Sequence, residues 1–359
     1  EYYKCPFSLF CNLGLKLKPI RRVEFSPLES GNTIHYVLEK LISANTGKGL
    51  LTLTKDEIRT QVAQLLEEYL RTQTVGQEEF SSRLSYQFTR IFNSLTKLVL
   101  HLQAEFAQSR FEPLAFELDM ANSEKVTPIK LDCIDGSHVE IVGKIDRVDI
   151  MDNGDEKYVR VVDYKSGIKT FKLSDIYYGL NLQMLVYLFT IWQNGKNELE
   201  NCLPAGILYM PSGDKIITIS RKADEIEVEK ARTSKYKMNG LVLQDIQVIT
   251  GMEQQGAGVL IPARITSKGE IDGRSSVANL AQMGVLKRYI QKLISEMAEN
   301  LYNGKIAAQP VDGGGYAPCA YCPYTAVCGH EKEDKKRDVT AIDKEALFEM
   351  LKAEEGEKE

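Results

Sequence analysis

The chain has 359 residues, 43% of them apolar and 26% charged, as expected of a globular protein with one large or two ordinary domains. It has no apolar run of transmembrane length and no signal peptide, and its odd number of cysteines, seven, argues against a secreted disulfide framework, so we expect a cytoplasmic protein. The net charge of −5 argues only mildly against binding to nucleic acid, because residues 331–359 supply most of it.

The first third of the chain is predicted to be helical. Apolar residues recur at helical spacing in residues 31–44, where Ile34, Leu38 and Leu41 form one stripe, and again in residues 54–72 and 77–109. Thr54, followed three residues later by Glu57, is typical of a capping box. We therefore expect three helices before the first strand.

The pattern changes after Pro113, where short β-type segments begin. Residues 114–120 predict a strand, and residues 139–151 and 157–167 predict a hairpin because Asn153-Gly154 between them is a strong turn signal. Farther along, we expect a helix over 174–193, strands over 205–211 and 215–220, helices over 224–238 and 276–303, and a mobile Gly-rich loop over 251–275. This order predicts a mixed α/β core with helical additions on its N-terminal side.

The hairpin carries charged residues on one face. Side chains two positions apart in a strand share a face, so Asp146, Asp163 and Lys165 lie on one face together with several valines. A turn centred on Asn153-Gly154 would place Asp146 opposite Val161 and diagonal to Asp163, close enough for both carboxylates to reach one cation.

These charges have a structural and a functional explanation. Carboxylates on an apolar face cost several kcal/mol each unless they are paired or bound to metal. In the structural explanation, Asp163 pairs with Lys165, and Asp146 meets Arg147 or another cation. In the functional explanation, the two carboxylates hold a hard cation such as Mg²⁺, which prefers oxygen ligands. The two carboxylates and the lysine together favour the functional explanation.

The hairpin motifs resemble the core of the PD-(D/E)xK nucleases. GKIDRVD followed by VVDYKSG is similar to that core in the variant with Asp as the second carboxylate. The resemblance implies that Asp146 and Asp163 bind metal and that Lys165 is the catalytic lysine. It also implies that the backbone carbonyl of Tyr164 is a further metal ligand.

Two further motifs resemble the RecB-type subgroup of these nucleases. GNTIH, residues 31–35, is similar to its G-x-x-x-H element and implies that His35 is a metal ligand. QMLVY is similar to its Q-x-x-x-Y helix and implies that Gln183 and Tyr187, which share a helix face, line the site and contact substrate. Glu117 is an additional candidate acid. Each signal alone also fits ordinary packing, but the order of the four motifs along one chain is specific.

Three cysteines near the C-terminal end have the spacing of a metal or cluster site. Cys319, Cys322 and Cys328 are separated by two and five residues, and the spacing leaves the fourth ligand open. The same nuclease subgroup includes iron–sulfur enzymes with one cysteine before the core and three after it. The resemblance therefore implies a [4Fe–4S] cluster on these three residues and Cys5.

Two alternatives to that cluster remain open. A structural Zn²⁺ on the same four thiolates is compatible with the residue type and count. Cys11 is a rival for the fourth position, although its apolar surroundings favour a packing role. Cys133 and Cys202 have no cysteine partners at useful spacing and are expected to be packing residues.

The opening YYKCPFSLFCNLGLKLKP and the closing PCAYCPYTAVC together resemble the AddB family, the nuclease-bearing subunits of bacterial AddAB helicase–nucleases. The resemblance covers residues 1–330 and implies one nuclease domain there, with its core at about 112–220, an iron–sulfur staple joining its termini, and a charged tail at 331–359. It implies a Mg²⁺-dependent exonuclease, with Mn²⁺ as a substitute. Such an enzyme would act in double-strand-break repair and recombination on single-stranded DNA fed by an AddA-like partner subunit, and it would cut the 5′-ended strand.

Two other functions are compatible with the motifs. One is a non-catalytic DNA-binding module stabilised by a cluster or zinc, and the other is a stand-alone iron–sulfur exonuclease of the CRISPR-adaptation kind. Because the chain begins with Glu1 rather than Met and opens like the AddB family, we expect a piece of a longer protein and disfavour the stand-alone enzyme. Several basic residues could contact phosphates: Arg21, Arg22, Lys169, Lys172, Arg232, Lys235 and Lys237.

Overall fold

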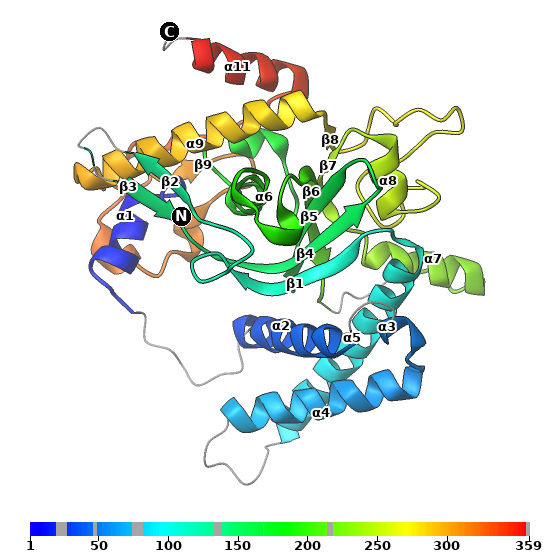
Figure 1. Ribbon diagram of the computed structural model, residues 1–359. Coiled ribbons are helices and arrows are strands. Elements are labelled where there is room, and N and C mark those ends of the chain that lie inside the picture. Colours follow the sequence, from blue (N-terminus) through cyan, green and yellow to red (C-terminus); the bar gives the residue numbers. More distant parts are fainter. Residues whose placement is uncertain are drawn as a thin grey trace.

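The computed structural model describes residues 1–18, 27–45, 49–73, 82–132, 136, 138–167, 169–213 and 218–356. Its centre is a six-stranded mixed sheet in the order β1-β4-β5-β6-β7-β8 (Figure 1). The pairs β5–β6 and β7–β8 are parallel and the other neighbours are antiparallel. The strands are β1 (Glu112–Asp119), β4 (Lys144–Asp152), β5 (Lys157–Lys165), β6 (Leu203–Pro211), β7 (Asn239–Leu243) and β8 (Val277–Ala278). The predicted mixed α/β core is therefore confirmed.

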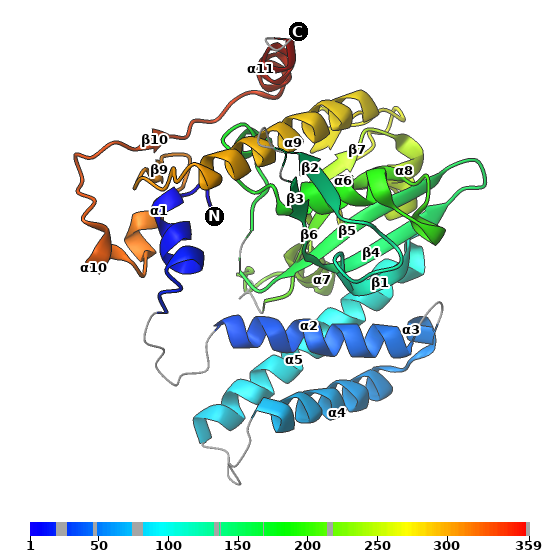
Figure 2. The same cartoon turned by 60° about the vertical axis from the view of Figure 1, so that its left-hand side comes forward.

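Helices cover both faces of this sheet. Figures 1 and 2 show α6 (Gln183–Asn194) and α9 (Leu280–Tyr302) over one face, and α2 (Pro27–Ala44) and α5 (Ser82–Gln108) over the other. Helix α4 (Lys55–Gln73) packs on α2 and α5 from outside. The three predicted N-terminal helices are confirmed, although residues 77–81 of the third lie outside the described part of the chain. The α2 stripe of Ile34, Leu38 and Leu41 is buried, which stabilises the layer by about 1.5–3 kcal/mol per side chain.

The hairpin of β4 and β5 differs from its prediction in register. Its loop comprises the four residues 153–156, so Val148 pairs with Val161 and Arg147 pairs with Val162. The predicted pairing of Asp146 with Val161 is therefore wrong, because the turn is centred one residue later than Asn153-Gly154. A shift of the centre by a whole residue moves each partner by two positions and preserves the faces. The same register carried one residue further sets Asp146 opposite Asp163.

The helix predicted over 174–193 is broken into two parts. A short 3₁₀ helix covers Leu173–Ile176, and α6 begins only at Gln183. Between them, Gly179 and Asn181 have left-handed backbone angles, with φ of +75° and +55°, which no right-handed helix contains. The break lets the segment before α6 run across the end of the sheet.

Other segments also depart from the expected elements. Of the strand predicted over 215–220, residues 215–217 lie outside the described part of the chain and residues 218–220 form no strand. The expected helix over 276–303 is preceded by β8, and the expected Gly-rich loop carries the buried residues Ile261 and Ala263. Strand β7, helix α8 (Ile246–Met252) and strand β2 (Ile129–Asp132) were not predicted. The strand predicted over 139–151 is divided, and its first part, β3 (His138–Ile141), pairs with β2. Helix α7 (Glu225–Lys235) was predicted.

The start of the chain meets a segment about 30 residues before the C-terminal end beside the sheet. Figure 2 shows α1 (Pro6–Leu9) next to α10 (Thr325–Cys328), and the hydroxyl of Tyr324 donates a hydrogen bond to the carbonyl of Leu17. The N–H of Val311 in β9 (Val311–Asp312) donates to the carbonyl of Lys4. The last helix, α11 (Lys344–Gly356), packs on α9 through buried Leu347 and Leu351. The remaining elements are a π-helix (Phe10–Gly14), α3 (Gly49–Thr52), 3₁₀ helices (Asn197–Leu199 and Pro318–Tyr321) and β10 (Arg337–Asp338).

Candidate metal and cysteine sites

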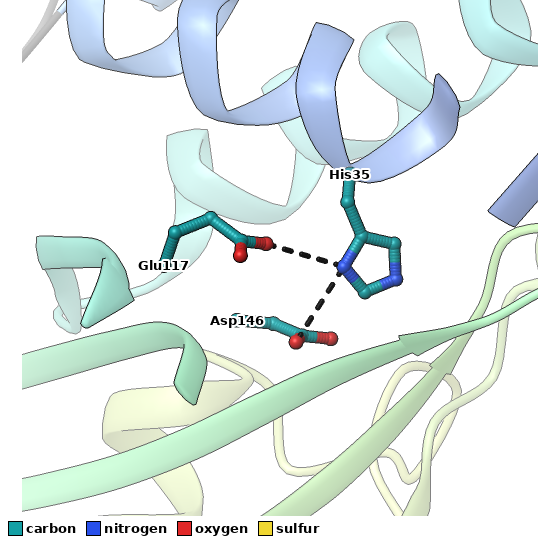
Figure 3. A group of neighbouring side chains, drawn as sticks. All are labelled: His35, Glu117 and Asp146. Carbon is teal, nitrogen blue, oxygen red and sulfur yellow. Dashed lines mark hydrogen bonds and ion pairs between the residues drawn. The ribbon is translucent and has the colours of Figure 1, made fainter. Parts of the chain in front are cut away.

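Three side chains from separate elements converge at one end of the β1–β4 pair. His35 comes from α2, Glu117 from β1 and Asp146 from β4, and Figure 3 shows all three pointing toward one another. The Nδ1 atom of His35 lies 3.2 Å from Glu117 Oε1 and 3.5 Å from Asp146 Oδ1. One ligand atom from each residue lies within 4.8 Å of the other two, a spacing that a single metal ion can bridge. Sequence reasoning had named Glu117 only as an additional candidate.

The remaining predicted ligands lie beside this group. The N–H of Tyr164 donates to Asp146 Oδ2 at 3.0 Å, and the carbonyl oxygen of Tyr164 lies 3.2 Å from His35 Nε2. The Lys165 ammonium donates to Asp163 Oδ1 at 2.9 Å and lies 2.7 Å from Oδ2. The predicted pair of Asp163 and Lys165 is therefore present, whereas Asp146 meets His35 and not Arg147, which points to the opposite face of the sheet.

Burial and crowding perturb these acids. Burial raises the pKa of Asp146 to about 6, and the negative charge of Asp163 acts in the same direction. Burial also raises the pKa of Asp163, although the Lys165 ammonium opposes the shift. Burial raises the pKa of Glu117 as well, but hydrogen bonds from His35 and Lys144 outweigh it, so the net shift is downward. A cation among these oxygens would stabilise their charged forms.

His35 lies among these acids as a countercharge. Burial acts to lower the pKa of His35, but the hydrogen bond to Glu117 and the charge of Asp146 outweigh it and raise the pKa. Both ring nitrogens face acceptor oxygens, which suits an imidazolium that donates from each of them. A metal ligand must be neutral, so metal binding here would release a proton. The donor set of one imidazole and several carboxylate oxygens fits a divalent cation.

Gln183 and Tyr187 form a pair on the first turns of α6. Gln183 Nε2 donates to the Tyr187 hydroxyl at 2.9 Å. The Tyr187 ring lies against Gly143, where an added Cβ would come within 2.6 Å of the hydroxyl oxygen. Gly143 therefore allows the tyrosine to approach the strand end three residues before Asp146. Among the described hydrogen bonds, neither side chain of this pair contacts the carboxylates of the site.

The cysteine near the start of the chain and the three cysteines of residues 319–328 share one cavity. Cys5, Cys319, Cys322 and Cys328 all line a space of about 320 Å³, and no disulfide joins them. Cys11 is fully buried nearby and does not line the space. Burial raises the pKa of Cys319, and the neighbouring thiols of Cys5, Cys322 and Cys328 raise it further, so the four groups lie within electrostatic reach of one another.

The spacing of these sulfur atoms bears on what could bind them. Among the described residues, no three cysteines have sulfur atoms all within 4.8 Å of one another. A tetrahedral Zn²⁺ with bonds of about 2.3 Å would require sulfur–sulfur distances of about 3.8 Å. As they lie, the described cysteines do not form a closed single-ion site. Cys202 is buried elsewhere, as expected of a packing residue, and Cys133 lies outside the described residues.

Sequence reasoning missed a buried charge network on the opposite face of the hairpin. The side chains of Glu105, Arg147, Asp149 and Arg160 are all 0% exposed. Arg160 lies 2.6 Å from Glu105 and 2.7 Å from Asp149. Arg147 lies 2.8 Å from Asp149, and it donates to the Tyr164 hydroxyl at 3.0 Å. The signal in the sequence was Arg147 and Asp149, two apart and hence on one face of a strand whose remaining neighbours include Ile145, Val148 and Ile150.

Comparison with known proteins decides the family. The model of the PD-(D/E)XK nuclease superfamily matches residues 1–329. The chain belongs to this superfamily. The mixed sheet with its covering helices is therefore the PD-(D/E)XK nuclease fold, and the predicted fold class is confirmed. Nucleases of this superfamily depend on metal, and the acidic group at His35 is a possible metal site in this chain.

The chain is also similar to proteins named as the B-type subunits of ATP-dependent helicase/deoxyribonucleases. It is 31% identical to that of Acetivibrio thermocellus over 333 residues, which cover 91% of this chain and 29% of that protein. It is 32% identical to that of Ruminiclostridium cellulolyticum over 94% of this chain and 30% of that protein. It is 32% identical to that of Clostridium novyi over 99% of this chain and 32% of that protein. The chain thus spans about three tenths of the length of these relatives. None of its described helices is long and apolar enough to cross a membrane.

Proposed function

We propose that this chain is the nuclease domain of an AddB-type protein, a Mg²⁺-dependent deoxyribonuclease that acts as an exonuclease on single-stranded DNA. Membership of the PD-(D/E)XK superfamily and the names of the relatives support the reaction class. The observation that carries the proposal is the convergence of His35, Glu117 and Asp146 beside the Asp163–Lys165 pair. In this proposal the domain comprises residues 1–330, with its core at about 112–220, and residues 331–359 are an appended tail.

The residues divide the work of hydrolysis. Asp146, Asp163, His35 and the carbonyl of Tyr164 would hold Mg²⁺ or Mn²⁺, and the position of Glu117 adds a further carboxylate. A bound cation would supply Lewis acidity, which offsets charge on the scissile phosphate and acidifies water. Water attacks the phosphorus, the bond to one ester oxygen breaks, and that oxygen leaves with a proton.

Lys165 is the proposed catalytic lysine in this scheme. Its side chain is 38% exposed and its ammonium is bonded to Asp163, so the ammonium can turn from the carboxylate toward the phosphate and stabilise the charge that develops there. The Gln183–Tyr187 pair would line the same site and position the strand, a role that the contact of Tyr187 with Gly143 and its hydrogen bond from Gln183 support.

The cysteines would hold a [4Fe–4S] cluster as a structural clasp. The shared cavity supports a site on Cys5, Cys319, Cys322 and Cys328 over one that includes Cys11, and the resemblance to iron–sulfur nucleases supports a cluster there over zinc. The cluster would join the start of the chain to residues 319–328 and would have no part in hydrolysis. Iron and sulfide analysis together with a broad absorbance band near roughly 400 nm would support it, whereas a colourless, zinc-containing protein would exclude it.

The names of the relatives support a partner and a pathway for the proposed nuclease. Those relatives are subunits of an ATP-dependent helicase/deoxyribonuclease, and the chain covers only about three tenths of them. We therefore place the domain beside an AddA-like helicase–nuclease partner that delivers single-stranded DNA in the cytoplasm during double-strand-break repair and recombination. The 5′-ended strand is the proposed substrate.

The test is a cleavage assay on labelled single-stranded DNA with Mg²⁺. Asp163→Ala and Lys165→Ala should each lower the cleavage rate by at least about 10²-fold, while circular dichroism shows that both variants fold. Lys130→Met, on the remote β2–β3 ribbon, is the matched control and should cleave like the parent. Variants as active as the parent would sink the assignment, and DNA binding without cleavage under any divalent ion would favour a non-catalytic module.

A further inference from the structure

One ammonium group near the proposed metal site lacks a carboxylate partner. Lys165 pairs with Asp163, and Lys144 pairs with Glu117 at 2.8 Å. Lys169 forms no ion pair among the described residues and donates instead to the side-chain oxygen of Asn181. Its side chain is half-buried, so the unpaired charge is costly to maintain unless an anion binds it.

The position of Lys169 follows from the strand register. Tyr209 on β6 is the direct neighbour of Asp163 on β5, and in-register side chains on adjacent strands point to the same face. The Lys169 ammonium lies 5.8 Å from the centroid of the Tyr209 ring. The Lys169 ammonium is therefore next to the side chain that neighbours Asp163 on the adjacent strand.

A chain of side-chain hydrogen bonds holds this ammonium in place. Asn181 donates from Nδ2 to Asp175 at 2.6 Å and to the Tyr316 hydroxyl at 2.7 Å. The Tyr316 hydroxyl donates in turn to Asp175 at 2.6 Å. Because both amide hydrogens of Asn181 are used, its oxygen is left to face Lys169. The chain is anchored by Asp175, which is buried, and by Tyr316, three residues before Cys319.

Two further positive charges act on Lys169. Burial lowers its pKa, and the ammonium groups of Lys4 and Lys165 lower it further. Lys4 precedes Cys5 at the clasp, and Lys165 belongs to the proposed metal site. The carboxylates of Asp175 and Asp163 act in the opposite direction but do not reverse this shift, and a bound anion would relieve the repulsion that remains.

From this geometry we infer that Lys169 is the binding group of a phosphate subsite beside the metal site. It holds a phosphate of the single strand adjacent to the one that is cleaved, on the side that leads toward the cysteine clasp. A compact ammonium suits this ligand because it binds phosphate as a point charge without bidentate geometry. The inference rests on the proposed function, since it takes the ligand to be the DNA substrate.

The test measures binding without cleavage. Fluorescence anisotropy of labelled oligo(dT) in EDTA, over a series of salt concentrations, gives an affinity and a salt slope for the 359-residue chain. Each phosphate contact on a single strand contributes about 0.7 to the slope. Lys169→Met should reduce the magnitude of the slope by about 0.7 and weaken binding about fivefold at about 0.1 M salt. Lys169→Arg should restore both.

The matched control is Lys352→Met on α11, an exposed lysine whose loss changes net charge equally. It should leave the slope unchanged. If Lys169→Met keeps the parental slope and affinity, or if Lys352→Met alters them equally, the phosphate subsite is refuted. That failure is separable from failure of the proposed function, because cleavage with Mg²⁺ reports on Asp163 and Lys165 and the EDTA experiment does not.

Discussion

The substitution Arg147→Met should destabilise the fold strongly, because it leaves an uncompensated charge in the core. Arg147 is fully buried and bonds to Asp149 at 2.8 and 3.1 Å and to Glu105 at 3.2 Å. Without it, Glu105 and Asp149 share Arg160 alone. Breaking a buried ion pair by removing one partner costs about 3–5 kcal/mol. At about 2 °C per kcal/mol for a chain of this size, the melting temperature should fall by about 6–10 °C in thermal denaturation.

Two further variants make this prediction refutable. Arg147→Met combined with Asp149→Leu removes one charge of each sign and leaves the 2.6 Å pair of Glu105 and Arg160, so it should be more stable than Arg147→Met alone. Lys130→Met breaks the exposed 2.7 Å pair with Glu140 and should cost less than about 1 kcal/mol. If Arg147→Met costs no more than Lys130→Met, or the double variant costs the sum of its singles, the reasoning is wrong.

Two other predictions concern the proposed sites. Cys319→Ala should lower the melting temperature, while the cleavage rate of the folded fraction stays close to that of the parent. A variant with normal thermal stability would contradict the clasp. Asp146→Asn should raise the free energy of unfolding in EDTA at about pH 7 by up to about 3 kcal/mol. The pKa of Asp146 in the folded protein is about 6, so the parent protein has its full stability from this group below about pH 4 and loses it as the pH rises through 6. Asparagine imitates the protonated acid, so thermal melts at about pH 4 should show no such difference, and an equal difference at both pH values would exclude this cause.

The elements of the fold were largely predictable because their signals are local. Helical periodicity and the Asn153-Gly154 turn lie within short windows, and the corresponding helices and hairpin are present. The hairpin register was mispredicted because the Asn153-Gly154 signal marks a turn without fixing its length or its exact centre. The break before α6 depends on the left-handed residues Gly179 and Asn181, and nothing in the apolar pattern around them marks it.

The candidate site was predictable in its motif residues and less so in their partners. Asp146 and His35 stand in recognisable patterns, and the structure brings them within 3.5 Å of each other. The close approach of Glu117 depends on the pairing of β1 with β4, which no local pattern determines. Glu105 in the buried network has the same origin, since its partner Arg147 lies 42 residues away.

The alternation of β4 and β5 gives like residues opposite tasks. On the sealed face, the acids Glu105 and Asp149 are neutralised by arginine guanidiniums that are fully buried and always charged, so nothing can replace these cations. On the other face, the acids meet an imidazole that can lose its proton and a Lys165 side chain that is 38% exposed. Those countercharges are exchangeable, and a divalent cation can take their place. The same carboxylate chemistry is therefore structural where its cation is fixed and open to catalysis where its cation can leave.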